Sequence, residues 1–370
     1  MIRKQKIVVA MSGGVDSSTV AAMLKNEGHE VIGITLQLYD HGVALQKKGA
    51  CCAGVDIYDA QMVAEKINIP HYVLNYESIF KQRVIDDFAE SYLKGETPIP
   101  CVRCNQKVKF NDLFNVAKNL DADALATGHY VRKISGADNA QMHKGLDSTK
   151  DQSYFLFTTT KEQLNYLMFP IGGMYKSETR ALAKEFGLEI AEKPDSQDIC
   201  FVPSGGYGDL IQRMRPDAFI PGDILFKDGT IIGTHKGIFH YTVGQRKGMN
   251  IGGYSEPLYV LEIKPEKRQI WVGFRSDLRS PEFFIKDLNW LYEGSIPDEG
   301  IECVVKIRSG HLGSPARVYR EYDGKNRVVL LCDDYIAIAP GQACVMYNDS
   351  RLLGGGWIMS RDNFRESFHN

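Results

Sequence analysis

Hydrophobic and polar positions follow two different patterns along the chain, and the change falls near residue 218. Before it, short β-branched runs typical of buried strands occur at residues 7–10, 31–36, 71–74 and 124–127. Apolar positions recur near helical spacing at residues 17–26, 56–67, 79–94, 111–119, 161–169 and 176–186, with Gly187 placed to end the last helix. This alternation predicts an α/β fold, with a parallel sheet covered by helices on both faces.

After residue 218 the hydrophobic runs become short and alternating, and turn dipeptides separate them. Asp228-Gly229 and Asp323-Gly324 are typical of tight hairpins, because glycine readily adopts the backbone angles that such turns need. We therefore expect the second half to be mostly β, in two small modules that meet near residues 275–281.

Composition narrows the class of protein. The chain has 370 residues, 44% of them hydrophobic, and a formal net charge of −2. This apolar fraction excludes a disordered chain. No apolar run approaches the roughly 18 residues of a membrane span, so we expect a cytoplasmic protein without a membrane partner. The eight cysteines are too sparse for a secreted disulfide scaffold and are expected to be buried, metal-bound or catalytic.

Residues 12–18, Ser-Gly-Gly-Val-Asp-Ser-Ser, lie between the first predicted strand and the first predicted helix. A glycine-rich turn at a helix N-terminus binds anions through backbone N–H groups. The segment lacks the Lys-Ser/Thr of a Walker A loop and the spacing of a dinucleotide fingerprint, and the alternative is an ordinary serine-capped helix. It resembles the signature loop of the PP-loop ATP pyrophosphatases. That resemblance implies ATP as substrate, Asp16 positioning Mg²⁺ and phosphates, and loop contacts from Ala10, Met11, Ser12, Gly13, Gly14, Val15 and Ser17.

Two cysteines have features of reactive thiols. Cys104 lies beside Arg103, Lys107 and Lys109, and we expect this positive charge to lower its pKa. Cys200 precedes the glycine-rich residues 204–208, which suits a thiol that must move. Two such thiols are able to transfer sulfur, one as a persulfide and the other by forming a disulfide with it. A cysteine can also serve only as a small buried apolar side chain, and we expect this for Cys303, Cys332 and Cys344.

Five segments, at residues 12–18, 127–130, 150–156, 195–201 and 241–248, resemble in order and spacing the tRNA-specific 2-thiouridylases. The resemblance implies ATP-dependent 2-thiolation of the wobble uridine in the tRNA anticodon loop, with Cys200 carrying the persulfide and Cys104 attacking it. It implies that Leu36 and Gly128 contact the nucleotide. It places tRNA contacts at His129, Lys150, Asp151, Gln152, Arg308, Ser309 and Gln342.

The same resemblance implies the domain organisation and the partners. We expect a PP-loop catalytic domain at residues 1–165, to which residues 195–215 return, a central tRNA-binding module at 166–277 and a C-terminal β-barrel at 278–370. The expected partners are the tRNAs for lysine, glutamate and glutamine, together with a persulfide donor protein.

The chain departs from the family pattern at Cys101, where many members have an aspartate three residues before the attacking cysteine. The resulting Cys101-x-x-Cys104 pair leaves two metal hypotheses open. One is zinc held with Cys51 and Cys52, although adjacent cysteines rarely chelate one zinc ion. The other is an iron–sulfur cluster on Cys101, Cys104 and Cys200.

The near-zero net charge conceals local excesses of basic residues. Residues 231–281 carry eight basic and four acidic side chains, and residues 306–327 carry six and two, so each segment has a net charge of +4. Such segments suit phosphate contacts, but they also occur on solvated β surfaces. Two other functions remain open at this point: a PP-loop synthetase acting on a small metabolite, and an RNA-binding module without catalytic activity.

Overall fold

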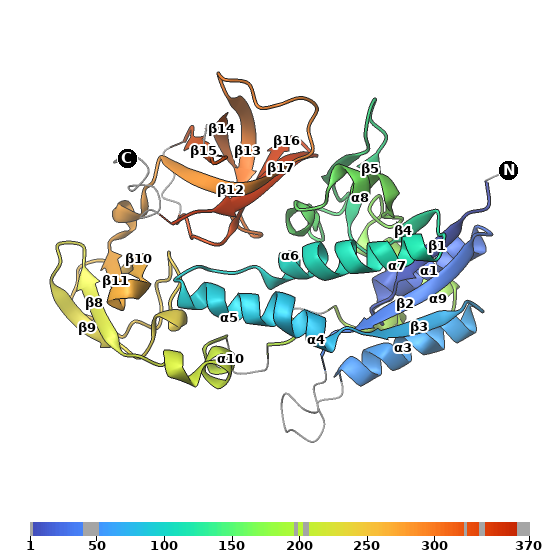
Figure 1. The fold of residues 1–370 in the computed structure, drawn as a ribbon, viewed down its shortest axis with the longest axis horizontal. Coiled ribbons are helices and arrows are strands. Elements are labelled where there is room, and N and C mark those ends of the chain that lie inside the picture. Colours follow the sequence, from blue (N-terminus) through green and yellow to red (C-terminus); the bar gives the residue numbers. More distant parts are fainter. Residues whose placement is uncertain are drawn as a thin grey trace. The chain divides into compact units, whose positions relative to one another are not determined.

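The computed structural model describes residues 3–39, 52–195, 199–202, 207–321, 324–332 and 337–360. Two compact units make up the chain (Figure 1). The first unit contains Met1–Ile85, Cys101–Phe201 and Ser350–Leu352, and the second contains Asp86–Pro100, Val202–Asp349 and Leu353–Asn370.

The first unit is built on a five-stranded parallel sheet with the strand order β3-β2-β1-β4-β7. The strands are β1 (Lys6–Ala10), β2 (Glu30–Gln37), β3 (His71–Asn75), β4 (Ala124–Ala126) and β7 (Leu167–Met168). Ile7 and Val9 of the central strand are fully buried in the core, as the predicted β-branched run requires. The α/β fold expected from the hydrophobic pattern is therefore confirmed.

Helices connect the strands of this sheet. The α-helices of the first unit are α1 (Val15–Asn26), α3 (Cys52–Lys66), α4 (Glu77–Phe80), α6 (Pro100–Cys104, whose first residue is assigned to the second unit), α7 (Phe114–Asn119), α8 (Lys161–Tyr166) and α9 (Lys176–Glu185). Short 3₁₀-helices span Ser153–Leu156 and Glu189–Glu192. Gly187 follows α9 with a φ of +66°, the left-handed conformation expected for a residue that ends a helix.

Three predicted helices differ in detail from the structure. Residues 81–85 form the π-helix η1, and residues 105–113 form the π-helix η2, which leads into α7. Residues 167 and 168, expected to end a helix, form strand β7 beside β4. Because α8 ends at Tyr166, the two apolar residues that follow are available to extend the sheet.

A hairpin completes the first unit. Strands β5 (Val131–Ile134) and β6 (Gln141–Lys144) pair antiparallel, and His143 of β6 pairs with Arg351. The sequence pattern did not predict these strands, because only Val131 and Met142 are buried.

The second unit is mostly β, as expected. Strands β8 (Gly222–Phe226), β9 (Ile231–His235), β10 (Tyr259–Lys264) and β11 (Gln269–Gly273) form a sheet with the order β10-β11-β8-β9. The predicted hairpin at residues 227–230 joins β8 to β9, and Gly229 has a φ of +92°. Helices α5 (Asp86–Leu93) and α10 (Tyr207–Met214) belong to the same unit.

A six-stranded barrel forms the rest of the second unit, in the order β12-β15-β14-β13-β16-β17, and pairing between β12 and β17 closes it. The strands are β12 (Glu282–Trp290), β13 (Ile301–Lys306), β14 (Ser314–Arg320), β15 (Asn326–Leu330), β16 (Ala343–Asn348) and β17 (Arg351–Ile358). Strands β14 and β15 are antiparallel neighbours, and residues 322–323 of the predicted hairpin lie outside the described residues. Cys303 and Cys344 are buried in the barrel core and Cys332 packs against it, as expected. Within the described ranges, no helix is long and apolar enough to cross a membrane.

Candidate active site

The loop between β1 and α1 has a backbone that requires glycine. Gly13 has a φ of +71°, and a Cβ atom there would lie 2.0 Å from the carbonyl oxygen of Asp56. The backbone N–H of Ser12 donates to the Ser17 hydroxyl at 3.0 Å, and the two serine hydroxyls lie 3.2 Å apart. These bonds fold the loop over the N-terminus of α1, the geometry that favours anion binding.

Gly128 packs directly on this loop from the end of β4. A Cβ atom at Gly128 would lie 2.7 Å from the backbone nitrogen of Ser17 and 3.0 Å from the Cβ atom of Asp16. Close approach of two backbones therefore explains this glycine, and the structure brings it together with the predicted loop. Met11 is fixed as well, since its carbonyl accepts a hydrogen bond from the Thr35 hydroxyl at 2.9 Å. A loop and a strand end that exclude side chains fit the phosphates of ATP.

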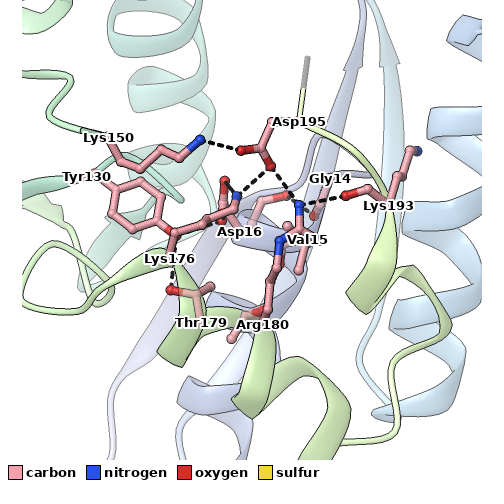
Figure 2. A network of polar contacts seen from close by, with 12 residues as sticks. Gly14, Val15, Asp16, Tyr130, Lys150, Lys176, Thr179, Arg180, Lys193 and Asp195 are labelled. Carbon is pink, nitrogen blue, oxygen red and sulfur yellow. Dashed lines mark hydrogen bonds and ion pairs between the residues drawn. The ribbon is translucent and has the colours of Figure 1, made fainter. Parts of the chain in front are cut away.

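A network of charges extends from the loop to α9 and to the segment that follows it (Figure 2). The Nζ atom of Lys176 lies 2.7 Å from Oδ1 of Asp16 and 2.8 Å from Oδ1 of Asp195. The hydroxyl of Tyr130 donates to Asp16 at 2.9 Å and contacts the Thr179 hydroxyl at 3.0 Å. Asp16, the predicted magnesium-positioning residue, therefore lies beside an ammonium group.

Asp195 lies at the centre of the network. Besides Lys176, it accepts hydrogen bonds from Lys150 at 2.8 Å and from Arg180 at 3.0 Å. Burial by itself raises the pKa of Asp195, but the hydrogen bonds from Lys150 and Lys176 outweigh it and lower the pKa to about 2. The carboxylate is therefore charged at neutral pH and holds three cations close to the loop.

Lys193 connects the loop to α3. Its Nζ atom lies 3.0 Å from the Gly13 carbonyl oxygen, 2.6 Å from Asp56 and 2.5 Å from Asp59. Burial acts to lower the pKa of Lys193, yet hydrogen bonds with the two aspartates raise it overall. Sequence analysis missed Lys176, Arg180 and Lys193, because their partners are distant in the sequence and no motif marks them.

The two predicted thiols lie in one region of the first unit. Cys104 is buried in a cluster with Phe80, Val84 and Val108, and Phe201, the residue after Cys200, packs against this cluster. The ring centroids of Phe80 and Phe201 are 5.8 Å apart in an edge-to-face arrangement. Leu36, the predicted adenine contact, also packs against the cluster. Part of Cys200 reaches the surface.

The expectation that nearby positive charge lowers the pKa of Cys104 is wrong, and the pKa of Cys200 is raised as well. Burial raises the pKa of Cys104, and the Lys109 ammonium offsets only part of this effect. Burial also raises the pKa of Cys200 to about 12, with further increases from Cys104 and Cys101, although a hydrogen bond with Tyr39 acts in the opposite direction. Both thiols are therefore protonated at neutral pH, because desolvation outweighs the nearby positive charge.

His129 follows Gly128 at the end of β4. Its Nδ1 atom lies 2.8 Å from the Thr127 hydroxyl, and its ring packs edge-on against Phe110 with 5.8 Å between centroids. Burial and the Lys109 ammonium lower the pKa of His129 to about 3, so the ring is neutral at physiological pH. It is able to form hydrogen bonds with a base but not to supply positive charge.

Residues 150–152, predicted to contact tRNA, make hydrogen bonds within the first unit. Lys150 is paired with Asp195, as described above. Asp151 accepts from the backbone N–H groups of Gly145 and Ser153, and Gln152 accepts from the backbone N–H of Tyr130 at 2.9 Å. These bonds hold the segment beside the β4 turn, and whether it also contacts RNA stays a prediction.

The other predicted tRNA contacts belong to the second unit. Arg308 and Ser309 are exposed between β13 and β14, whereas the Gln342 side chain donates to the Thr97 carbonyl at 3.0 Å. In the conspicuous segment of residues 241–248, Gln245 bonds to the backbone of Thr242 and Lys247, leaving Arg246 and Lys247 exposed. Two of the basic side chains of residues 306–327 are paired with carboxylates, Arg317 with Glu302 and Arg327 with Glu321, so part of the positive charge of this segment is neutralised.

The metal hypotheses gain no support from the geometry. Among the described residues, no group of three or more His, Cys, Asp or Glu side chains is arranged to hold a metal ion, and this includes the set of Cys101, Cys104 and Cys200. Cys51 and the side chain of Cys52, needed for the zinc hypothesis, lie outside the described residues. We therefore derive no chemical step through a cluster or a zinc ion.

Comparison with known families agrees with this architecture. A tRNA methyl transferase HUP domain matches residues 5–204, a tRNA methyl transferase PRC-barrel domain matches 208–274, and an aminomethyltransferase beta-barrel domain matches 280–358. A solved 4-thiouridine synthetase in complex with RNA and ATP is 18% identical, with a TM-score of 0.34 over 58% of this chain and 51% of that one. The parallel sheet and the glycine loop define a nucleotide-binding α/β protein of the HUP class.

Similarity to curated proteins identifies the family more narrowly than these domain matches do. The tRNA-specific 2-thiouridylase MnmA of Rickettsia africae (strain ESF-5) is 59% identical over 356 residues, covering 96% of this chain and 97% of the relative. Its counterpart in Rickettsia canadensis (strain McKiel) is 59% identical over 352 residues, covering 95% of each. The chain belongs to the tRNA-specific 2-thiouridylase family, as the five sequence motifs predicted.

Proposed function

We propose that this protein catalyses the ATP-dependent 2-thiolation of the wobble uridine of tRNA in the cytoplasm. The observation that carries the proposal is the combination, in one unit, of a phosphate-type loop with the cysteine pair Cys104 and Cys200, in a chain of this family. A synthetase acting on a small metabolite requires neither the cysteine pair nor the basic surface at Arg246 and Lys247.

In the first step, the 2-oxygen of the uridine attacks the α-phosphate of ATP and pyrophosphate leaves. The backbone N–H groups of residues 13–17 and the positive end of α1 hold the phosphates. Lys176 and Lys193, whose ammonium groups lie beside the loop, supply balancing charge. When bound, Mg²⁺ would neutralise charge on the polyphosphate, and Asp16 is the carboxylate of this loop that would hold it.

In the second step, sulfur replaces the adenylated oxygen. A donor protein first leaves a persulfide on Cys200. The Cys104 thiol loses its proton to water and attacks the inner sulfur of that persulfide. The S–S bond of the persulfide breaks, a Cys104–Cys200 disulfide forms, and the terminal sulfur leaves with the electron pair as hydrosulfide. Hydrosulfide attacks C2 of the activated uridine, AMP leaves, and an external thiol later reduces the disulfide.

The tRNA contacts follow the family resemblance. His129, neutral and placed at the end of β4, lies on the same turn as Gly128 and is suited to hydrogen-bond a flipped base. The other proposed contacts are Lys150, Asp151 and Gln152 of the first unit and Arg308, Ser309 and Gln342 of the second unit. The substrates are the tRNAs for lysine, glutamate and glutamine.

The test is a thiolation assay in vitro. The full chain is incubated with ATP, unmodified tRNA and a small-molecule persulfide, and the digested nucleosides are analysed for 2-thiouridine. Wild-type protein and the Cys332→Ser control should form 2-thiouridine, whereas Cys104→Ser and Cys200→Ser should not. Full thiolation by both active-site variants would refute the proposed mechanism, and release of pyrophosphate without any thiolated nucleoside would refute the proposed reaction.

A further inference from the structure

Lys109 lies on the π-helix η2, which begins at the residue after Cys104. A π-helix joins each backbone N–H to the carbonyl five residues earlier, so side chains five positions apart lie on neighbouring turns of one face. In an α-helix the same two side chains point about 140° apart. The π-helical backbone therefore turns Lys109 toward the side of the helix that carries Cys104.

The neighbours of Lys109 support this orientation. Val108 is buried in the same cluster as Cys104, and Phe110 packs against the ring of His129. Lys109 itself is half-buried between these two residues. It makes no hydrogen bond or ion pair with the part of the chain that the structure describes. An ammonium group without a carboxylate partner is available to stabilise an anion that forms beside it.

The thiols are the groups on which this charge acts. The Lys109 ammonium lowers the pKa of Cys101, Cys104 and Cys200, although burial prevails at each of them. Of the other cations in the same stretch, Arg103 donates a hydrogen bond to the Gln106 side chain. Lys109, rather than Arg103 or Lys107, is the cation with the main effect on the pKa of the three thiols.

We propose that Lys109 is a catalytic residue of the sulfur-transfer step, where its ammonium group stabilises the Cys104 thiolate and then the hydrosulfide that leaves the Cys200 persulfide. This inference rests on the proposed function. The reaction moves negative charge from one sulfur to another within a mostly apolar cluster, where a fixed cation is worth more than in water. The proton of Cys104 goes to water, and Lys109 takes no part in the proton transfer.

The groups that act on the pKa of Cys200 come from several elements: Cys104 and Cys101 belong to α6, Lys109 lies on η2 and Tyr39 follows β2. His129, which follows β4, is itself affected by Lys109. Tyr39 donates a hydrogen bond to Cys200, and His129 is neutral. Among these described groups, Lys109 is the one that carries positive charge, so its removal should leave the developing anion without a charged partner.

The experiment compares Lys109→Met, Lys109→Arg and the matched control Lys107→Met in the full chain. Single-turnover thiolation of tRNA should slow about tenfold or more in Lys109→Met, because each unit of pKa increase at Cys104 leaves about tenfold less thiolate. Lys109→Arg should retain most of the rate, and Lys107→Met all of it. ATP–pyrophosphate exchange with tRNA should be unchanged in all three, which also shows that they are folded.

A second readout separates this inference from the proposed function. In a Cys101→Ser/Cys200→Ser background, the rate of Cys104 alkylation by iodoacetamide is measured by mass spectrometry between pH 7 and pH 10. Lys109→Met should shift the alkylation profile to higher pH, and Lys107→Met should not. Unshifted profiles, or equal shifts in both variants, would overturn the role of Lys109. Absence of thiolation by the wild-type protein would instead refute the proposed function, and the alkylation profile would still decide whether Lys109 acts on Cys104.

Discussion

The Nζ atom of Lys176 lies 2.7 Å from Asp16 and 2.8 Å from Asp195, so one ammonium group joins the phosphate loop to the segment that leads to Cys200. The Lys176 side chain is 11% exposed, which limits screening by water. Lys176 therefore connects the loop proposed to bind ATP with the segment that leads to Cys200, and the bond from Lys193 to the Gly13 carbonyl is a second connection.

Replacing this lysine should destabilise the protein. We expect Lys176→Met to lower the free energy of unfolding by about 1–3 kcal/mol, between the values for exposed and fully buried ion pairs, because Asp16 and Asp195 lose a shared partner. Urea unfolding of the full chain, monitored by circular dichroism, measures the change. Lys184→Met is the control on the same helix, since its pair with Glu192 is exposed and should contribute little. Equal stability of the two variants would contradict the account of Lys176.

Gly13 offers a test of the loop geometry. Gly13→Ala should weaken ATP binding strongly and lower the melting temperature, because the new Cβ atom would lie 2.0 Å from the Asp56 carbonyl oxygen and the φ of +71° disfavours alanine. Isothermal titration with ATP and a thermal melt measure both effects. At Gly54, in α3, an added Cβ meets no atom within 4 Å, so Gly54→Ala should leave both properties unchanged or slightly improve stability. Normal ATP affinity in Gly13→Ala would show that the loop does not hold the phosphates.

His129 should make stability depend on pH. Its pKa is lowered to about 3 in the folded protein from an ordinary value of 6.5, so between these values the unfolded chain binds a proton that the folded protein does not. This contribution is fully present above pH 6.5 and is lost as the pH falls toward 3. We expect His129→Asn to lose less stability than wild type between pH 7 and pH 5, by about 2 kcal/mol. Parallel loss of stability in the two proteins, measured by urea unfolding at both pH values, would show that His129 titrates normally.

The sequence predicts the sheet of the first unit because each of its main strands is marked by a run of mostly apolar residues. Ile7 and Val9 are fully buried on a continuous β-branched run, and the positions of Gly13 and Gly128 follow from the motifs that contain them. The sequence alone therefore locates the glycine loop, whereas the roles of Cys104 and Cys200 stay a prediction.

The same patterns did not predict the π-helices or the charge network. Apolar spacing near residues 105–113 is compatible with both helix types, and only tertiary packing selects the wider one. Lys176 and Asp16 are 160 residues apart, so no local signal connects them. The expected low pKa of Cys104 was wrong for a similar reason, since burial comes from Phe80 and Val84 in another part of the chain.

The most direct test of the central claim is the fate of the two cysteines in one turnover. Wild-type protein carrying a persulfide on Cys200 is mixed with ATP and tRNA without reductant, then alkylated, digested and analysed by mass spectrometry. Because Cys104 attacks the persulfide in the proposed mechanism, we expect a Cys104–Cys200 disulfide in a one-to-one ratio with 2-thiouridine, and no 2-thiouridine when ATP is omitted. Formation of 2-thiouridine while both cysteines remain open to alkylation would contradict the account.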